Sequence, residues 1–392
     1  MKKSRIKFID LFAGIGGFHL AVRKILPNSE CVWACEKDPQ TARIYKLNFG
    51  IEAHYDITKY DESQIPKFDL LCGGFPCQPF SKGGDQKGFA DIRGTLFFDI
   101  IRIVKYHKPK YILLENVSNI LSHDNGNTYK VITSSLKDLG YNLPEQPLKI
   151  SPHDLGFPIQ RNRVFILAVR ENLPIPINIH VERRQKELKK IHLKNFFPFD
   201  TNINDKSVFL NDYEKKVLQM WDEFHIGIKQ KSIGFPIWYD YFQWKEPIEH
   251  LPKWKQNFIL KNKQLYIENK SFISQWQVKY NYLNWVNNTQ KKFEWQCGSD
   301  YSSIFDCIIQ FRPSGVRVKR PNNFSTLVAM NHTQIIGWLG RRLTLNEAKK
   351  LQGFDENYQL SENRALHMKQ LGNAVNVNVV AEILKSLFHH GK

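Results

Sequence analysis

Short apolar runs alternate with helical patterns through the first 170 residues of this 392-residue chain. Apolar residues three and four apart indicate helices, and short continuous apolar runs indicate buried strands. The predicted strands are 6–11, 31–35, 68–72, 111–114 and 164–169, and the predicted helices are 17–26, 39–48, 95–106 and 128–139. This alternation predicts an α/β fold with a parallel sheet covered by helices on both faces. Ligands bind such sheets at the carboxyl ends of the strands.

The alternation stops after about residue 172 and order returns near the C-terminus. Seven of the nine tryptophans lie in the stretch between, interleaved with lysine and asparagine. Aromatic and basic residues together can form a nucleic-acid face, but for any single tryptophan a core position is the favoured interpretation. Two further helices are predicted over 343–353, with Thr344 as N-cap, and over 374–387.

Lys and Arg total 56 against 38 Asp and Glu, a formal charge of +18. This charge is typical of a protein with a polyanionic partner, and nucleic acid is the first candidate. An ordinary basic surface is an equally good interpretation of the charge alone. About +8 of it lies between residues 171 and 325, so the positive charge is spread over the whole chain. We expect no signal peptide and no membrane span. Six scattered cysteines without a Cys-x-x-Cys pair predict reduced, cytosolic thiols and no metal site.

Segment 8–18 reads as a strand, a glycine-rich turn and a helix. Glycines let the backbone approach a ligand closely, and a helix N-terminus offers free N–H groups. Glu36 stands at the end of the second strand, about 20 residues later, where an acid can accept the hydroxyls of a ribose. Asp56 follows the third segment. The alternatives are a tight turn without a ligand and two ordinary solvated carboxylates.

Cys77 is the sharpest candidate for chemistry. It lies between Pro76 and Pro79 in a glycine-rich loop that follows a strand. Such a loop holds a thiol stiffly and exposed, which suits a nucleophile far better than a core position.

A carboxyl and two guanidinium groups flank the later strands. Glu115 stands at a strand end in an apolar setting, which predicts a raised pKa and the ability to donate a proton. Arg161 and Arg163 alternate along an extended segment, so both point to one face and suit a phosphate or a base carbonyl. A solvated surface pair is the alternative for the arginines.

In their residues and in their order along the chain, these motifs resemble those of the DNA (cytosine-5)-methyltransferase family. The resemblance covers about 1–170 and 337–392, and includes Gly94-Thr95-Leu96-Phe97, Glu115-Asn116-Val117, Arg341 to Phe354 and Gln370 to Val375. It implies an S-adenosylmethionine site, with S-adenosylhomocysteine as product, formed by Phe12, Gly14, Gly16, Gly17, Glu36, Asp56, Ile57, Pro76, Leu96 and Asn373. It also implies catalytic roles for Cys77, Glu115, Arg161 and Arg163, and DNA contacts from Gln78, Ser81, Arg161 and Arg163, without a metal.

The resemblance implies a mechanism. The Cys77 thiolate attacks C6 of a flipped cytosine, Glu115 protonates N3 and Arg163 holds O2, with Arg161 in support. The base that removes the C5 proton is not identified. Three departures occur: Lys37 stands where relatives often carry an aromatic that stacks on adenine, Ile159 where they commonly carry glutamine, and Ala374 where serine is usual.

The predicted fold is therefore Rossmann-like, with a smaller, loop-rich target-recognition domain. We expect residues 1–172 to form the first part of the catalytic domain, 173–367 the target-recognition domain, and 368–392 a helix returning to the catalytic domain. The resemblance implies a prokaryotic, cytoplasmic and monomeric enzyme, and its expected partners are double-stranded DNA and a restriction endonuclease that cuts the same site. Alternatives are an RNA (tRNA) cytosine-5 methyltransferase, a non-catalytic DNA-binding regulator, and a nicotinamide-dependent dehydrogenase.

Overall fold

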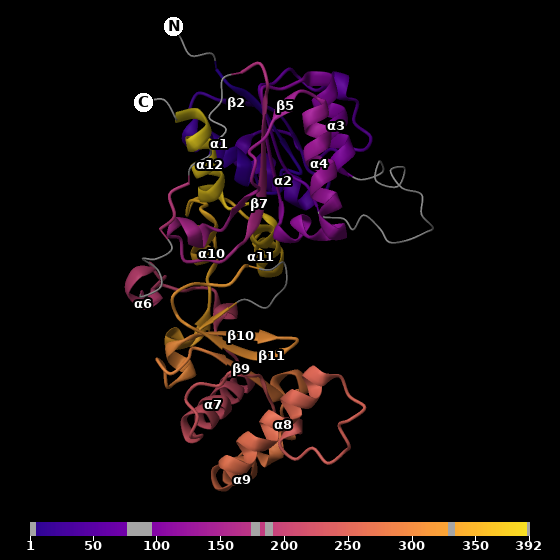
Figure 1. Cartoon of the computed structure of the whole chain (residues 1–392). Coiled ribbons are helices and arrows are strands. Elements are labelled where there is room, and N and C mark those ends of the chain that lie inside the picture. The colour runs from indigo at the N-terminus through magenta and orange to yellow at the C-terminus, as the bar shows by residue number, and fades with distance from the viewer. Residues whose placement is uncertain (1–4, 77–95, 174–180, 185–190, 328–333, 390–392) are drawn as a thin grey trace. The chain divides into compact units, whose positions relative to one another are not determined.

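The computed structural model describes residues 5–76, 96–173, 181–184, 191–327 and 334–389. The chain divides into two compact units, Met1–Lys189 with Ala348–Lys392, and Lys190–Glu347 (Figure 1). These boundaries differ from the predicted ones, because residues 348–367 belong to the first unit and not to the Trp-rich stretch. The side chain of Asn48 shows why: it accepts from the N–H of Gln359 and donates to its carbonyl, both at 2.9 Å.

The sheet of the first unit has seven strands in the order β2-β1-β3-β4-β7-β5, with β6 also paired to β7. Strands β1 to β4 are mutually parallel, as predicted, but β7 pairs antiparallel with β4. The chain enters β7 from the short strands β5 and β6 without the crossover that a parallel strand requires. The strands are β1 (Lys7–Leu11), β2 (Glu30–Cys35), β3 (Leu70–Gly74), β4 (Tyr111–Val117), β5 (Tyr141–Asn142), β6 (Leu148–Ile150) and β7 (Arg163–Arg170).

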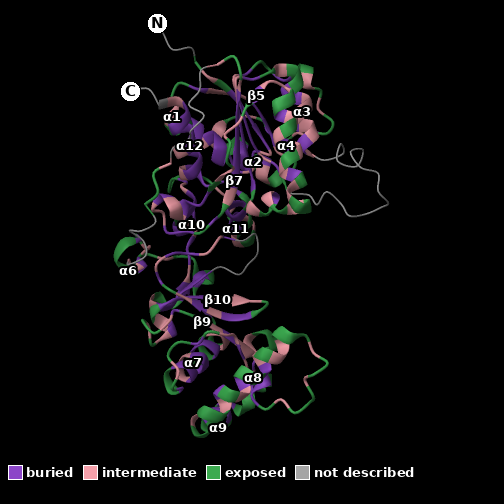
Figure 2. Ribbon diagram, viewed as in Figure 1, coloured by how far each residue is buried: buried purple, intermediate pink, exposed green. Residues whose placement is uncertain are grey.

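Helices α1 and α12 lie on one side of this sheet and α3 and α4 on the other (Figure 1). Figure 2 shows that the strands are buried while the outer faces of α3 and α4 are exposed, which is the three-layer arrangement expected for this pattern. The helices are α1 (Gly17–Ile25), α2 (Pro39–Phe49), α3 (Leu96–His107), α4 (Asn127–Asp138), α11 (Arg364–Asn373) and α12 (Val377–His389). Helix α11 had not been predicted.

Helix starts follow from local side chains. Asp38 accepts from the N–H of Thr41 at 2.8 Å ahead of Pro39, so α2 begins with a capped first turn. The predicted cap at Thr344 is confirmed: its hydroxyl accepts from the N–H of Glu347 at 3.1 Å, and the Glu347 carboxylate accepts from the N–H of Thr344 at 2.8 Å. This capping box starts α10 (Leu345–Gln352).

The second unit contains more regular structure than a loop-rich domain. Its six-stranded sheet has the order β13-β12-β10-β11-β9-β8. The strands are β8 (Ile237–Trp238), β9 (Lys292–Gln296), β10 (Ile308–Arg312), β11 (Gly315–Lys319), β12 (Ile335–Ile336) and β13 (Arg341–Arg342). The helices are α6 (Leu193–Phe196), α7 (Asp212–Gly227), α8 (Lys253–Glu268) and α9 (Lys270–Lys279).

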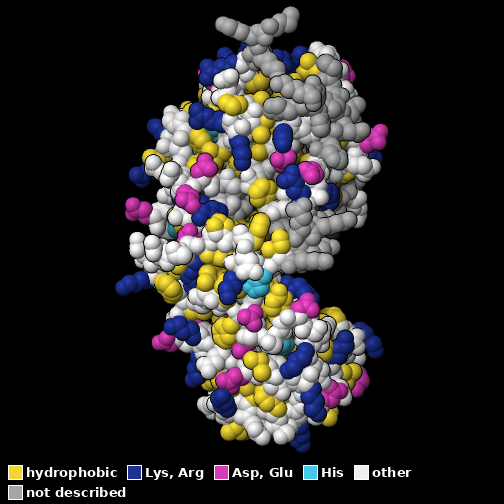
Figure 3. Space-filling model, turned by 90° about the vertical axis from the view of Figure 1, so that its left-hand side faces the viewer, with side chains coloured by type: hydrophobic (Ala, Val, Ile, Leu, Met, Phe, Trp, Pro, Cys, Tyr) yellow, Lys and Arg dark blue, Asp and Glu magenta, His cyan; other side chains and the backbone are white. Residues whose placement is uncertain are grey.

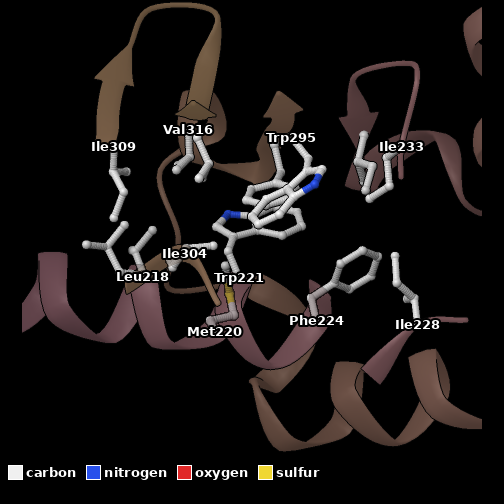
Figure 4. Packing of buried hydrophobic residues seen from close by; sticks show 14 of the residues in the cluster. Leu218, Met220, Trp221, Phe224, Ile228, Ile233, Trp295, Ile304, Ile309 and Val316 are labelled. Carbon is white, nitrogen blue, oxygen red and sulfur yellow. The ribbon is translucent and has the colours of Figure 1, made fainter. Parts of the chain in front are cut away.

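Three of the tryptophans in the second unit lie in its core. Trp221, Trp276 and Trp295 are each no more than 4 % exposed. Trp221 on α7 stacks on Phe293 of β9 with ring centroids 4.9 Å apart, and Figure 4 shows its indole pointing from the helix toward the strands. The favoured core interpretation is confirmed for these three, whereas Trp254 is 54 % exposed. Lys and Arg side chains are scattered over the visible surface of each unit rather than gathered in one stripe (Figure 3).

Candidate active site

A cavity of about 790 Å³ opens at the carboxyl ends of the parallel strands in the first unit. This volume suits a small-molecule ligand. Eleven of the predicted site residues line it: Phe12, Gly14, Glu36, Asp56, Ile57, Pro76, Leu96, Glu115, Arg161, Arg163 and Asn373. Positions up to 361 residues apart in sequence are therefore brought together by the sheet and the C-terminal return.

Five predicted residues are not among those that line the cavity. Cys77, Gln78 and Ser81 lie outside the described residues. Gly16 and Gly17 are placed behind the turn, where close packing requires glycine: a Cβ at Gly16 would collide with the Phe49 ring, and one at Gly17 would lie 2.8 Å from Val375.

The glycine-rich turn holds Glu36 at the edge of the cavity. Gly14 adopts a left-handed conformation, with φ of 55°, and its N–H donates to Glu36 Oε2 at 2.9 Å. The N–H of Asp38 donates to Oε1 at 2.8 Å. Burial raises the pKa of Glu36, and these two N–H groups act against that shift because they stabilise the charged form. Each oxygen accepts only one of these bonds, so both retain capacity for hydroxyl donors.

Asp56 is the second acid at this end. Its Oδ1 accepts from the Thr58 hydroxyl at 2.8 Å, and its Oδ2 lies 3.2 Å from the Lys37 ammonium. The Thr58 hydrogen bonds, followed by Lys37, lower the pKa of this carboxyl. Lys37, which stands where an aromatic was noted as usual, also lines the cavity and has a 78 % exposed side chain.

Glu115 and Arg163 form an ion pair at the other end of the cavity. Glu115 Oε1 lies 2.8 Å from Arg163 Nε, and the two side chains are 11 % and 17 % exposed. The antiparallel register explains the contact, because Arg163 faces Val117 across β4 and β7 and so lies diagonally next to Glu115. Burial raises the pKa of Glu115, as predicted, against the opposing charges of Arg161 and Arg163.

Arg161 lines the cavity but is almost fully buried. It is 3 % exposed, and its guanidinium donates to the carbonyls of Gly372 at 2.8 Å and Asn373 at 3.5 Å. Burial lowers the pKa of Arg161 to about 10. These bonds fix the end of α11, and with it Asn373, against the strand that carries Arg163.

Asn116 and Gln370 belong to motifs named from the sequence, but neither the contact that Asn116 makes nor the helix that carries Gln370 was predicted. Buried Asn116 donates from Nδ2 to the carbonyl of Phe75 at 3.0 Å and so fixes the chain just before Pro76. Helix α11 brings Lys369 and Gln370 to the cavity wall. The signal for this helix is Asn363, whose side chain accepts from the N–H of Leu366 at 3.1 Å and caps the first turn.

Within the described part of the chain, no group of three or more His, Cys, Asp or Glu side chains is placed to hold a metal ion. Nor does any described helix have the length and apolar character needed to cross a bilayer.

Comparison with known proteins matches residues 6–389 to the family described as C-5 cytosine-specific DNA methylase. The chain is 31 % identical to the type II methyltransferase M.AluI of Cellulosimicrobium cellulans, over 98 % of this chain and 92 % of that protein. It is 30 % identical to the type II methyltransferase M.BanI of Aneurinibacillus aneurinilyticus, over 98 % and 96 %. The crystal structure of S. pombe Dnmt2 methyltransferase is similar in fold, with a TM-score of 0.56, 20 % identity and 97 % of each chain covered.

Proposed function

The chain belongs to the C-5 cytosine-specific DNA methylase family and is a DNA (cytosine-5)-methyltransferase, and on that premise we propose how its site works. We propose that it methylates one cytosine within a short duplex sequence, as the modification enzyme of a type II restriction–modification system. The observation that carries the proposal is the convergence of Glu115 and Arg163 with Glu36 and Asp56 on one cavity.

The residues at the first end of the cavity fit S-adenosylmethionine. Glu36 keeps acceptor capacity on both oxygens, which suits the two hydroxyls of a ribose. Asp56 would accept from the exocyclic amine of adenine, with Phe12, Ile57 and Leu96 as apolar walls. Pro76 and Asn373 would lie toward the reacting end, near Gly14. When bound, this cofactor supplies an electrophilic methyl group.

The residues at the second end fit a flipped cytosine. Cytosine C5 is a poor nucleophile until the Cys77 thiolate bonds to C6 and moves the electron pair of the C5–C6 bond onto C5. Glu115 donates its proton to N3, which spreads the charge that develops in the ring. After methylation, loss of the C5 proton to a base restores the double bond and expels the Cys77 thiolate.

Arg163 and Arg161 share the orienting work. Arg163 binds Glu115 through Nε and donates from Nη1 to the carbonyl of Asn162 at 2.9 Å, so Nη2 is the nitrogen that would approach O2 of the base. Arg161 supports this contact from behind through the carbonyl of Gly372. Asn116 holds the strand end that leads to Cys77 through the carbonyl of Phe75.

The second unit is the proposed target-recognition domain, which reads base edges in the major groove. Gln78, Ser81 and Arg163 would contact the opened DNA. Arg161 was expected to do so as well, but its side chain is 3 % exposed and bonded to the carbonyl of Gly372, so we leave it out of this interface. Similarity to type II methyltransferases supports a prokaryotic enzyme that acts beside a restriction endonuclease of the same specificity. That the enzyme is cytoplasmic and monomeric is part of the same proposal.

Two alternatives to this function can be told apart by experiment. An RNA (tRNA) cytosine-5 methyltransferase would use the same catalytic residues on another polynucleotide. A non-catalytic DNA-binding regulator would have no use for the Glu115–Arg163 pair or for Cys77. A nicotinamide-dependent dehydrogenase is excluded by the family to which the chain belongs.

Bisulfite sequencing of DNA from cells that express the chain tests the proposal. We expect 5-methylcytosine at one position of one short recognition sequence, and none in cells that express Cys77→Ser. Purified protein should transfer methyl groups to duplex DNA carrying that sequence and not to tRNA. Equal methylation by the Cys77→Ser protein would contradict the mechanism, and transfer to tRNA alone would support the RNA alternative.

A further inference from the structure

The peptide unit that joins Ile15 to Gly16, in the centre of the glycine-rich turn, is held on both sides. Its N–H belongs to Gly16 and donates to the carbonyl of Ala13 at 2.8 Å. Its carbonyl belongs to Ile15 and accepts from the hydroxyl of Tyr358, a residue that is 343 positions away in sequence. Both Ile15 and Tyr358 are buried, so no water competes freely for these bonds.

This peptide depends on its hydrogen bonds because sterics do not fix it. Gly16 has φ of 83°, and without a Cβ it tolerates φ of either sign. A flipped peptide would turn the Ile15 oxygen toward the carbonyl of Ala13, in place of the N–H that now donates to it. The turn would then have to open. The hydroxyl of Tyr358 opposes this flip, because the flip would leave both the hydroxyl and a buried carbonyl unpaired.

Tyr358 is positioned independently of its hydroxyl. Its ring packs edge-on against Phe354 with centroids 4.9 Å apart and lies against Phe49, which covers Gly16. The next residue, Gln359, exchanges two hydrogen bonds of 2.9 Å with the side chain of Asn48. Burial also raises the pKa of Tyr358, so its hydroxyl keeps the proton that it donates.

The turn connects this contact to the cavity. Gly14, one residue before Ile15, donates its N–H to Glu36 Oε2 at 2.9 Å, and both Gly14 and Glu36 line the cavity. We propose that Tyr358 is a positioning residue that holds the turn, and through Gly14 the Glu36 carboxylate, in the shape that binds the cofactor. This inference rests on the proposed function, which places the S-adenosylmethionine ribose at Glu36.

Tyr358→Phe removes the hydroxyl and keeps the ring. We expect the affinity for S-adenosylmethionine and S-adenosylhomocysteine, measured by isothermal titration calorimetry, to fall about five-fold, the usual effect of one hydrogen bond. The KM for the cofactor should rise equally, while kcat at saturating cofactor stays unchanged. Hydrogen exchange of the amides in residues 12–20 should be faster in the variant without ligand.

Tyr141→Phe is the matched control. Tyr141 is buried in the same unit and donates its hydroxyl to the carbonyl of Pro109 at 2.7 Å, but it does not line the cavity. We expect Tyr141→Phe to lose about as much thermal stability as Tyr358→Phe. Its affinity for the cofactor should remain that of the wild type. Combining Tyr358→Phe with Glu36→Gln should weaken binding by less than the product of the two single effects, because both act on one contact.

Three results would overturn the inference. One is wild-type cofactor affinity and wild-type amide exchange in folded Tyr358→Phe. Another is an equal loss of affinity in Tyr141→Phe, which would assign the effect to general destabilisation. If the wild-type protein binds neither S-adenosylmethionine nor S-adenosylhomocysteine, the proposed cofactor fails together with the inference, whereas the first two results leave the proposed function intact.

Discussion

Glu36 and Glu115 stand at the carboxyl ends of β2 and β4 and line the same cavity, yet they are held by different groups. Glu36 accepts two backbone N–H bonds, from Gly14 after β1 at 2.9 Å and from Asp38 after β2 at 2.8 Å. Glu115 is paired with the Arg163 guanidinium at 2.8 Å. Burial raises the pKa of both carboxyls, so the difference between them lies in what opposes that rise.

This difference separates a fixed acceptor from a titrating acid. Backbone N–H groups cannot move away or change charge, so they keep the Glu36 carboxylate in one place as an acceptor for hydroxyls. A guanidinium also stabilises the charged form, but it can be shared with a ligand oxygen, which leaves the buried carboxyl free to take or give a proton. Substitutions at the Glu36 end of the cavity should therefore change cofactor affinity, and those at the Glu115 end should change the rate of methyl transfer.

Glu115→Gln should have the largest effect among changes to the described residues. The amide has a similar shape but no acidic proton, so kcat should fall by about 10²- to 10⁴-fold, the usual contribution of a general acid. Single-turnover methyl transfer measures this loss. Affinity for S-adenosylhomocysteine should match that of the wild type, and a joint loss of cofactor binding would break the separation between the two ends.

Arg163→Met removes one of the two charges, Arg161 and Arg163, that oppose the effect of burial on the pKa of Glu115. Because the guanidinium lowers the pKa of Glu115, its removal should raise that pKa further. The acid form is the active one, so activity is lost as pH rises through this pKa, and the alkaline limb of the pH–rate profile should move to higher pH. The rate at the optimum should also fall by about 10- to 100-fold, because an orienting charge-assisted contact is lost. A limb that moves to lower pH would contradict the assignment of Glu115 as acid.

Glu36→Gln should act on binding instead. Glutamine keeps one oxygen but presents an NH₂ group to one of the two N–H donors, so the turn loses a partner. We expect cofactor affinity to fall by about ten-fold, which corresponds to roughly one charge-assisted hydrogen bond. Calorimetry measures the affinity, and kcat at saturating cofactor serves as the control. A fall in kcat larger than the fall in affinity would show that the first end also takes part in the chemistry.

The same comparison shows what the sequence could predict. Glu36 and Glu115 each follow a predicted strand, and parallel strands end at one edge, so their convergence on one cavity followed from local patterns. Asp56 follows no predicted strand; the isolated bridge between Glu36 and His54 brings its segment to the same edge. The contact from Tyr358 to Ile15 could not be predicted, because nothing local relates positions 343 residues apart. The antiparallel direction of β7, which brings Arg163 beside Glu115, was missed for the same reason.

The second unit was harder to predict because its helices carry little pattern. Apolar and charged residues alternate irregularly along α8, where Trp254, Leu260 and Ile267 are all more than half exposed. Tryptophan counts indicated a core, and Trp221 confirms one, but a count does not say which elements enclose it. Tertiary packing decides such segments more than local propensity does.

Lys37→Ala should have the smallest effect, and it sharpens the contrast within the first end. The Lys37 side chain is 78 % exposed, and the ion pair that it forms with Asp56 at 3.2 Å is open to water and salt. Thr58 comes before Lys37 among the groups that lower the pKa of Asp56, and it bonds Oδ1 from both its hydroxyl and its N–H. We therefore expect Lys37→Ala to change cofactor affinity by less than about two-fold, and the change to vanish as salt rises. Thr58→Val, which loses the hydroxyl bond, should weaken binding more than Lys37→Ala at every salt concentration. The reverse order would mean that a mobile surface charge, and not the fixed hydrogen bonds, sets the position of Asp56.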